Sequence, residues 1–125
     1  MLRIIVSLLT IWLSASLPAF AKVHEWTCNF NRYHSANQHS MQAASNFILR
    51  FVYDDHTKQS TLIGSNGVVQ VDTYMGDRAV SFAERLSSGA IQTTTITFQS
   101  RIAVHSRHTL VGIELVPTQY YGKCR

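Results

Sequence analysis

The sequence has only two cysteines among its 125 residues, Cys28 and Cys124. It contains no C-x-x-C pair and no second cysteine cluster, which argues against a redox-active dithiol and against a zinc thiolate site. Two cysteines allow one intramolecular pairing, so in an oxidising compartment we expect a Cys28–Cys124 disulfide. This disulfide would close a loop of nearly the whole mature chain, which contributes about 4–5 kcal/mol to the free energy of unfolding in the chain-entropy model.

Long apolar runs and clusters of basic residues are also missing. The apolar run of about ten residues at positions 4–13 is too short to span a bilayer. The formal net charge of +4 is mildly basic, but the positive residues are scattered and no stretch interleaves them with aromatics. The sequence therefore gives no indication of nucleic-acid binding.

Residues 1–21 have the pattern of an export signal peptide. Arg3 supplies a positive n-region, positions 4–13 form the apolar segment, and Ala19-Phe20-Ala21 is a small-x-small cleavage site before Lys22. An uncleaved membrane anchor is the alternative, which the short apolar run and the cleavage site disfavour. We expect a mature domain at 22–125 that is periplasmic or secreted and has no membrane span.

The rest of the chain reads as short antiparallel strands. From Phe47 onward apolar residues recur with period two between short turns, and Asn66-Gly67 favours a tight hairpin. The polar stretch at 31–45 predicts a surface loop or one short helix. We expect about eight strands in a meander that closes into a single small β-barrel, because closure removes the sheet edges. A two-sheet β-sandwich is the alternative.

Closure of the predicted barrel also accounts for where the two cysteines lie. It places the first strand beside the last, and both cysteines fall on the apolar face of their strands, with Trp26 and Phe30 in the first and Tyr120 in the last. A disulfide at that position would join the two ends of the mature chain.

Six histidines are the most evident candidates for metal binding. Zinc or copper needs three or four imidazole, thiolate or carboxylate groups that converge. The candidates are His34 and His39 in the polar stretch and the pair His105 and His108, but residues three apart on a strand point to opposite faces. We therefore expect solvent-facing or hydrogen-bonded histidines, and no metal or other cofactor.

No nucleophile motif supports catalysis. Ser106, His108 and one of Asp54, Asp55 or Asp72 supply the residue types of a hydrolytic triad. The sequence has no G-x-S-x-G motif, however, and a triad is recognised by its geometry rather than by residue types. We expect a protein that is not an enzyme.

The segments "HSRH" and "QYY" suggest a recognition patch instead. We expect His105, Arg107, Gln119 and Tyr121 to share the exterior of neighbouring strands, with His108 nearby. Such a donor-rich surface with aromatic area suits an anionic or carbohydrate ligand, or an envelope protein. The alternative is an ordinary solvated strand face.

The stretch "TYMGDRAVSF" at 73–82 resembles the strand–turn–strand passage of the small exported β-barrel inhibitors of c-type lysozyme. The chain also resembles short exported proteins that end in a Tyr-x-Gly-x-Cys strand. The first resemblance implies a signal peptide, a barrel of similar size and one disulfide from an early strand to the chain's end. It places no inhibitory loop residue on this sequence. The partner that it implies, c-type lysozyme, is cationic like this chain, and like charges disfavour their association.

Three functions remain open from the sequence. The leading one is an exported, non-catalytic binding or inhibitory module that acts through its loops and outer face. The second is a small-ligand carrier that uses the barrel mouth, and the third is a metal-binding envelope protein. The carrier needs a cavity, which the expected interior aromatics leave little room for: Trp26, Phe47, Phe51, Phe82 and Phe98.

Overall fold

Eight strands make up the described part of the chain. The computed structural model describes residues 22–125 and, before them, Ser16 alone, so the predicted signal peptide lies almost entirely outside the described residues. The strands are β1 (Val23–Ser35), β2 (Gln42–Asp54), β3 (Gln59–Gly64), β4 (Gly67–Met75), β5 (Ala79–Arg85), β6 (Ile91–Thr97), β7 (Ile102–Val111) and β8 (Glu114–Cys124). No helix in this part of the chain is long and apolar enough to cross a membrane.

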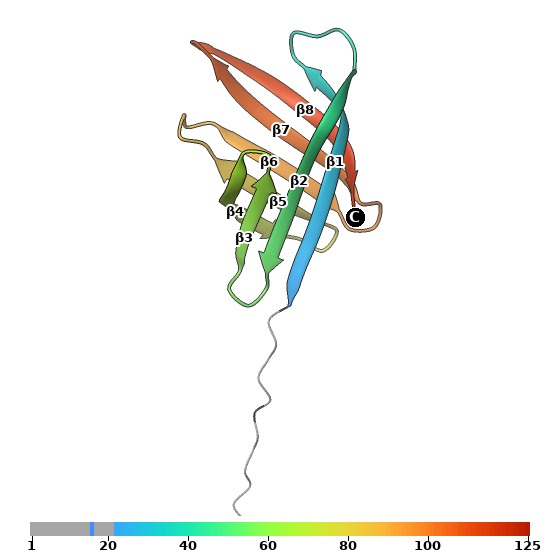
Figure 1. Cartoon of the computed structure of the whole chain (residues 1–125), viewed down its shortest axis with the longest axis vertical. Helices are drawn as coiled ribbons and strands as arrows, with labels where there is room; N and C mark the ends of the chain where they lie inside the picture. The colour runs from blue at the N-terminus through green and yellow to red at the C-terminus, as the bar shows by residue number, and fades with distance from the viewer. Residues whose placement is uncertain (1–15, 17–21) are drawn as a thin grey trace, which may run out of the picture.

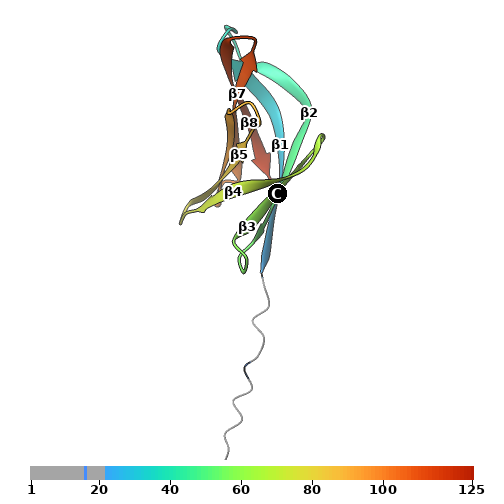
Figure 2. The same cartoon turned by 90° about the vertical axis from the view of Figure 1, so that its left-hand side faces the viewer.

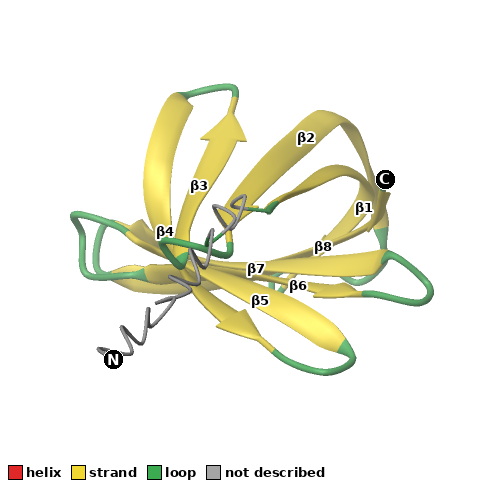
Figure 3. Ribbon diagram, turned by 90° about the horizontal axis from the view of Figure 1, so that it is seen from below, coloured by secondary structure: helices red, strands yellow, loops and turns green. Residues whose placement is uncertain are grey.

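Each strand pairs antiparallel with the next, and β8 pairs with β1, so the sheet closes into a barrel (Figures 1 and 3). The predicted all-β meander barrel of about eight strands is confirmed. The turns of the β1–β2, β3–β4, β5–β6 and β7–β8 hairpins lie at one end, which we call the hairpin mouth. The other end, at the start of β1, we call the N-terminal mouth. Figure 2 shows the β1–β2 and β7–β8 hairpins rising furthest at the hairpin mouth.

Alternating side chains from the strands fill the middle of the barrel. Phe51 and Phe82 stack with ring centroids 4.4 Å apart, and Trp26 packs on Phe82 at 5.7 Å. Phe47 and Phe98 are partly buried against this core. All five aromatics that we expected inside are therefore part of the interior packing.

The pairing of β1 with β8 closes the barrel and brings the two cysteines directly opposite each other. Cys28 and Cys124 are register partners, both are buried, and their sulfur atoms are bonded at 2.03 Å. Two strand positions away, a Cβ atom on Gly122 would lie 2.0 Å from the carbonyl oxygen of Asn29, so only glycine allows β1 and β8 to approach this closely. The predicted disulfide is confirmed, and it indicates a non-cytoplasmic compartment.

The polar stretch at 31–45 is mostly strand, so the prediction of a loop or short helix there is wrong. β1 continues to Ser35 and β2 starts at Gln42. Tyr33 pairs with Gln42 on one side and with Tyr120 on the other, which satisfies the backbone although the side chains are polar. A bulge after Phe30 and a positive φ at Asn46 interrupt the period-two pattern, which hid the strands from pattern reading.

Removal of the disulfide should cost this domain much of its stability. We expect the double variant Cys28→Ala/Cys124→Ala to lose about 4–5 kcal/mol of unfolding free energy in the chain-entropy model, because the unfolded chain regains the freedom of a loop of that length. Urea unfolding of the oxidised protein and the variant measures this difference. The oxidised protein placed in reductant is the matched control and should unfold at nearly the variant's midpoint. Equal midpoints for oxidised and reduced protein would contradict the prediction.

Candidate functional site

Each end of the packed interior opens into a pocket. The pocket at the hairpin mouth has a volume of about 270 Å³ and that at the N-terminal mouth about 670 Å³. Between them lie the buried aromatic rings of the core, so the two pockets are separate. Ligand chemistry inside the barrel can therefore take place only at its ends.

Arg107 dominates the pocket at the hairpin mouth. Its guanidinium carbon lies 4.7 Å from the ring centre of Phe47 and 5.0 Å from that of Tyr120, so two aromatic faces hold the cation. Its Nε donates a hydrogen bond to Nε2 of His105 at 3.3 Å. Among the described residues no carboxylate lies within ion-pair distance of Arg107. The cation is thus fixed in place without an acidic partner.

His105 holds Arg107 in position by accepting its hydrogen bond as a neutral imidazole. Because its Nε2 accepts from Arg107, its proton sits on Nδ1, which donates to Oγ1 of Thr94 at 2.7 Å. Burial, and then the neighbouring Arg107 charge, lowers the pKa of His105 from 6.5 to about 4. The ring also packs on Phe30 and Phe47, at 5.8 and 5.5 Å. This histidine is part of the barrel's structure and positions the arginine.

The rest of the pocket is mixed in chemistry. Glu84 and Gln92 face it from β5 and β6, and Ser65 and Asn66 line it from the β3–β4 turn. Its apolar lining comes from Phe47, Leu49, Leu62, Val69 and Leu86. A small pocket with one fixed cation, one carboxylate and apolar walls can bind a polar ligand that presents a carboxylate.

The structure divides the expected recognition patch between two faces of the sheet. His105 and Arg107 point into the barrel, whereas Gln119 and Tyr121 point outward, where the Tyr121 hydroxyl donates to Oε1 of Gln119 at 2.7 Å. His108 is exposed on the outer face of β7. The expectation that His105 and Arg107 share the exterior is therefore wrong.

The apolar pattern of β7 is the reason for this error. Ile102, which is large and apolar, faces outward and is half exposed, while Ala103 on the inner face is fully buried. The rings of Phe30 and Phe47 already occupy the interior beside β7, so its inner face carries a small residue and a hydrogen-bonded histidine. Apolar alternation within one strand does not reveal what the neighbouring strands have already filled.

The four candidate metal ligands lie in different places. His34 is near the end of β1, His39 is in the β1–β2 turn, His105 is inside the barrel and His108 is outside it. Within the described residues no group of three or more histidine, cysteine, aspartate or glutamate side chains is arranged to hold a metal ion. The structure gives a metal-site hypothesis no geometric support.

The hairpin tip at residues 108–117, which we call the finger, was not among the sites expected from the sequence. β6 pairs with β7 only as far as Ser106, and β1 pairs with β8 only as far as Thr118. Apart from a hydrogen bond at its base, from the backbone nitrogen of Ala36 to the carbonyl oxygen of Pro117 at 3.1 Å, the finger is a two-stranded ribbon that no other strand pairs with. Four large apolar side chains of the finger are exposed, and Ile113 at the turn is fully so: Leu110, Val111, Ile113 and Leu115. The clue in the sequence was "LVGIELV", an apolar run across a glycine turn, where turns are usually polar.

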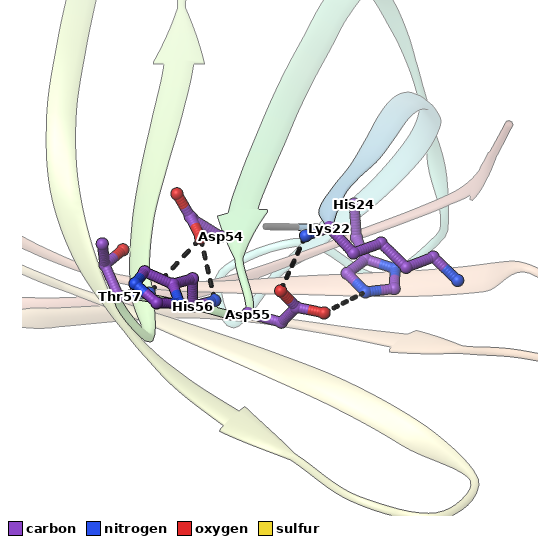
Figure 4. Close-up of polar contacts among 6 residues, drawn as sticks. All are labelled: Lys22, His24, Asp54, Asp55, His56 and Thr57. Carbon is purple, nitrogen blue, oxygen red and sulfur yellow. Dashed lines mark hydrogen bonds and ion pairs between the residues drawn. The ribbon is translucent and has the colours of Figure 1, made fainter. Parts of the chain in front are cut away.

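The N-terminal mouth is larger and more open to solvent. His24, Trp26 and Tyr53 form one wall, and Lys58 and Arg101 contribute cations. At its rim the backbone nitrogen of Lys22 donates to Oδ1 of Asp55 at 2.9 Å (Figure 4). None of these residues belonged to the patch expected from sequence.

Comparison with protein-family models, with curated proteins and with solved structures finds no match to this chain.

The buried histidine predicts how stability depends on pH. The unfolded chain protonates His105 near pH 6.5, whereas the folded protein does so only near pH 4, so the unfolded state binds more protons between these values. The unfolding free energy should therefore fall as the pH drops from 6.5 to 4, by about 3 kcal/mol from this residue. Urea unfolding of the parent and of His105→Gln at pH 7 and pH 4 measures it. The parent should lose more than the variant; equal losses would refute the assignment.

Proposed function

We propose that this protein is an exported, non-catalytic binding module that captures a protein partner with its finger. The observation that carries the proposal is the finger itself, an apolar ribbon that no other strand pairs with beyond its base at Pro117 and that projects from a barrel closed by a disulfide (Figures 1 and 2). Exposed apolar clusters of this kind are typical of interaction sites. The barrel holds the base of the finger, so the finger loses little conformational entropy when it binds.

The unpaired strand edges favour a protein partner over a lipid surface. From Arg107 onward, the outer edge of β7 presents backbone N–H and C=O groups that no strand of the barrel pairs with. A hydrocarbon environment leaves such groups unsatisfied, whereas a protein cleft or an added strand can bond to them. The charge at the tip is Glu114, which anionic lipids would repel. A partner with an apolar cleft and free backbone groups fits the finger better.

An inhibitory role is the form of binding that the fold favours. A rigid projecting loop that fills a cleft is the geometry by which small inhibitors block enzymes without large changes in shape. The resemblance at residues 73–82 makes c-type lysozyme the first partner to test. The periplasm or the extracellular space is the compartment we propose, in line with the disulfide.

The positions of the hydrolytic residue types support a role without catalysis. Ser106 and His108 lie on the outward side of β7, towards the hairpin mouth. Asp54 accepts hydrogen bonds from the backbone nitrogens of His56 and Thr57 in the β2–β3 turn, and Asp72 pairs with Arg85 on the outside of the barrel. These aspartates have structural partners of their own.

A charge at the tip of the finger should abolish capture without unfolding the protein. We expect Ile113→Asp/Leu115→Asp to lower affinity for the captured partner about 30-fold or more, since such a loss corresponds to about 2 kcal/mol at a buried contact. Both side chains are exposed, so the melting temperature should not change. Capture from an envelope extract by the immobilised, disulfide-intact domain gives the partner, and titration with the purified partner gives the affinity.

The control is Ile48→Asp/Ile102→Asp, which adds the same two charges at half-exposed isoleucines outside the finger. It should capture the same partner as the parent protein. Purified c-type lysozyme, assayed with and without the domain, tests the specific inhibitory case. If the finger variant binds like the parent, or the control variant loses binding equally, the finger is not the binding element.

The pocket around Arg107 favours a second function, the binding of a small carboxylate ligand at the hairpin mouth. Arg107 is held by His105 and two aromatic rings and has no acidic partner among the described residues. A guanidinium fixed in this way is ready to receive a carboxylate. This version of a ligand carrier uses a shallow mouth, since the barrel's middle is filled.

Acetate and acetamide, which have the same shape and differ in charge, test this second function. We expect acetate to shift the Arg107 Nε–H resonance with saturation and acetamide to leave it unchanged. Arg107→Lys should weaken acetate binding several-fold because the planar fork is lost, and Glu84→Gln should strengthen it by removing a negative charge from the pocket. A linear shift with acetate, or the same response in Arg107→Gln measured at neighbouring amides, would rule the pocket out.

A further inference from the structure

We infer that export processing builds an ion pair into the fold: cleavage between Ala21 and Lys22 creates an α-ammonium group that binds the carboxylate of Asp55. The pair would fasten the start of β1 to the β2–β3 turn at the N-terminal mouth. The inference is independent of the partner proposed above, because it concerns only how the mature chain begins.

The contact that carries this inference is already formed at Lys22. The backbone nitrogen of Lys22 donates to Oδ1 of Asp55 at 2.9 Å, and the backbone nitrogen of Asp55 donates to the carbonyl oxygen of Lys22 at 3.1 Å (Figure 4). Two hydrogen bonds therefore fix the nitrogen and the carboxylate relative to each other. That same nitrogen becomes the terminal amine if the chain is cut before Lys22.

The residues before Lys22 place the cut at this peptide bond, independently of the contact with Asp55. The small-x-small pattern Ala19-Phe20-Ala21 predicts cleavage after Ala21, and the first strand starts at Val23, one residue beyond the new terminus. A cut one residue earlier or later would move the amine by about 3.3 Å along the extended chain, out of reach of this hydrogen bond. The cleavage pattern and the acceptor thus coincide at one atom.

The chemistry of cleavage changes a neutral contact into a charged one. Water hydrolyses the Ala21–Lys22 amide bond, leaving a carboxylate on Ala21 and an amine on Lys22 that takes up a proton at neutral pH. The amide N–H···carboxylate hydrogen bond becomes an ammonium–carboxylate pair, which is shorter and stronger in kind. The remaining carboxylate oxygen of Asp55, Oδ2, lies 3.9 Å from Nε2 of His24.

Two adjacent aspartates have separate roles here. Asp54 uses its Oδ1 to accept from the backbone nitrogens of His56 and Thr57, which shapes the β2–β3 turn. The carboxylate of Asp55 makes none of those turn contacts and points at Lys22 and His24 instead (Figure 4). Asp55 can therefore be changed without removing the bonds that Asp54 gives to the turn.

Other charged groups surround the pair and enter any pH argument. His24, Lys58 and Arg101 line the same mouth, and Glu25 lines it too but is paired with Arg50 at 2.9 Å. The two cations oppose protonation of the amine, whereas Asp55 favours it. The amine is in direct contact with Asp55, so the carboxylate should prevail and raise its pKa above the ordinary value of about 8.

The first arm of the test is the mass of the exported product. The full chain is expressed with residues 1–21 in place, and the intact mass of the oxidised product should correspond to a chain that begins at Lys22. A mature chain that begins at any other residue would overturn the inference directly.

The second arm measures the terminal amine by NMR titration. In the Lys22-start protein the amine pKa should be raised, and Asp55→Asn should lower it by about half a unit or more. Asp72→Asn removes an equal charge from the outside of β4 and is the matched control, with little expected change. Equal amine pKa values in the parent and Asp55→Asn would overturn the ion pair even if the mass is as expected.

The third arm measures how the melting temperature depends on pH, and it needs no substitution of Asp55. A folded-state amine pKa above the unfolded value adds stability that is present below about pH 8 and lost as the pH rises through the folded pKa. A second protein, in which an added Gly-Ser precedes Lys22, has an amide nitrogen at Lys22 in place of the amine and keeps Asp55. Its melting temperature should lack the loss around pH 8 to 9 that the Lys22-start protein shows. Parallel curves for the two proteins would count against the pair.

Discussion

The pairing of β1 with β8 is the contact on which the rest of this structure depends. Every other strand pair joins neighbours in sequence through a short turn, but this one brings together residues up to 96 positions apart. It forms because Gly122 lets the two backbones approach and because the cysteines face each other in register. With the first and last strands joined, each of the eight strands has a paired neighbour on both sides, and the finger extends beyond the pairing of β6 with β7 and of β1 with β8.

The packing of the interior explains why chemistry lies at the ends of the barrel. β1 and β2 contribute the largest rings, and Phe82 of β5 completes the stack with Phe51. The strands opposite must then supply small or hydrogen-bonded side chains, which is why Ala103 and His105 face inward on β7. Two residues further along β7, the next inward position is Arg107, which lines the pocket at the hairpin mouth. Within the described residues, no buried side-chain nitrogen or oxygen lacks a hydrogen-bond partner.

Pattern reading succeeded where one face of a strand is continuously apolar. The inward rows Trp26-Cys28-Phe30 and Phe47-Leu49-Phe51 alternate cleanly and were placed correctly. It failed at residues 31–45, where the strands carry polar side chains and a bulge shifts the register. It failed again on β7, because the inward face there depends on which rings other strands have already placed in the core. The finger escaped notice because its apolar residues suggested burial, and only the pairing limits of β6 and β1 show that nothing covers them.

By itself, the sequence determined the all-β class, the meander order and the one possible disulfide, since turn residues, period-two alternation and a cysteine count act locally or allow a single outcome. The tertiary structure alone decided which face of β7 points inward, where the sheet stops being paired, and which charged groups meet. Those outcomes follow from volume and register summed over several strands. Arg107 lies between Phe47 and Tyr120 because closure of the sheet brought β2 close to β7 and β8. Lys22 lies against Asp55 because the pairing of β1 with β2 extends to Val23 and Asp54.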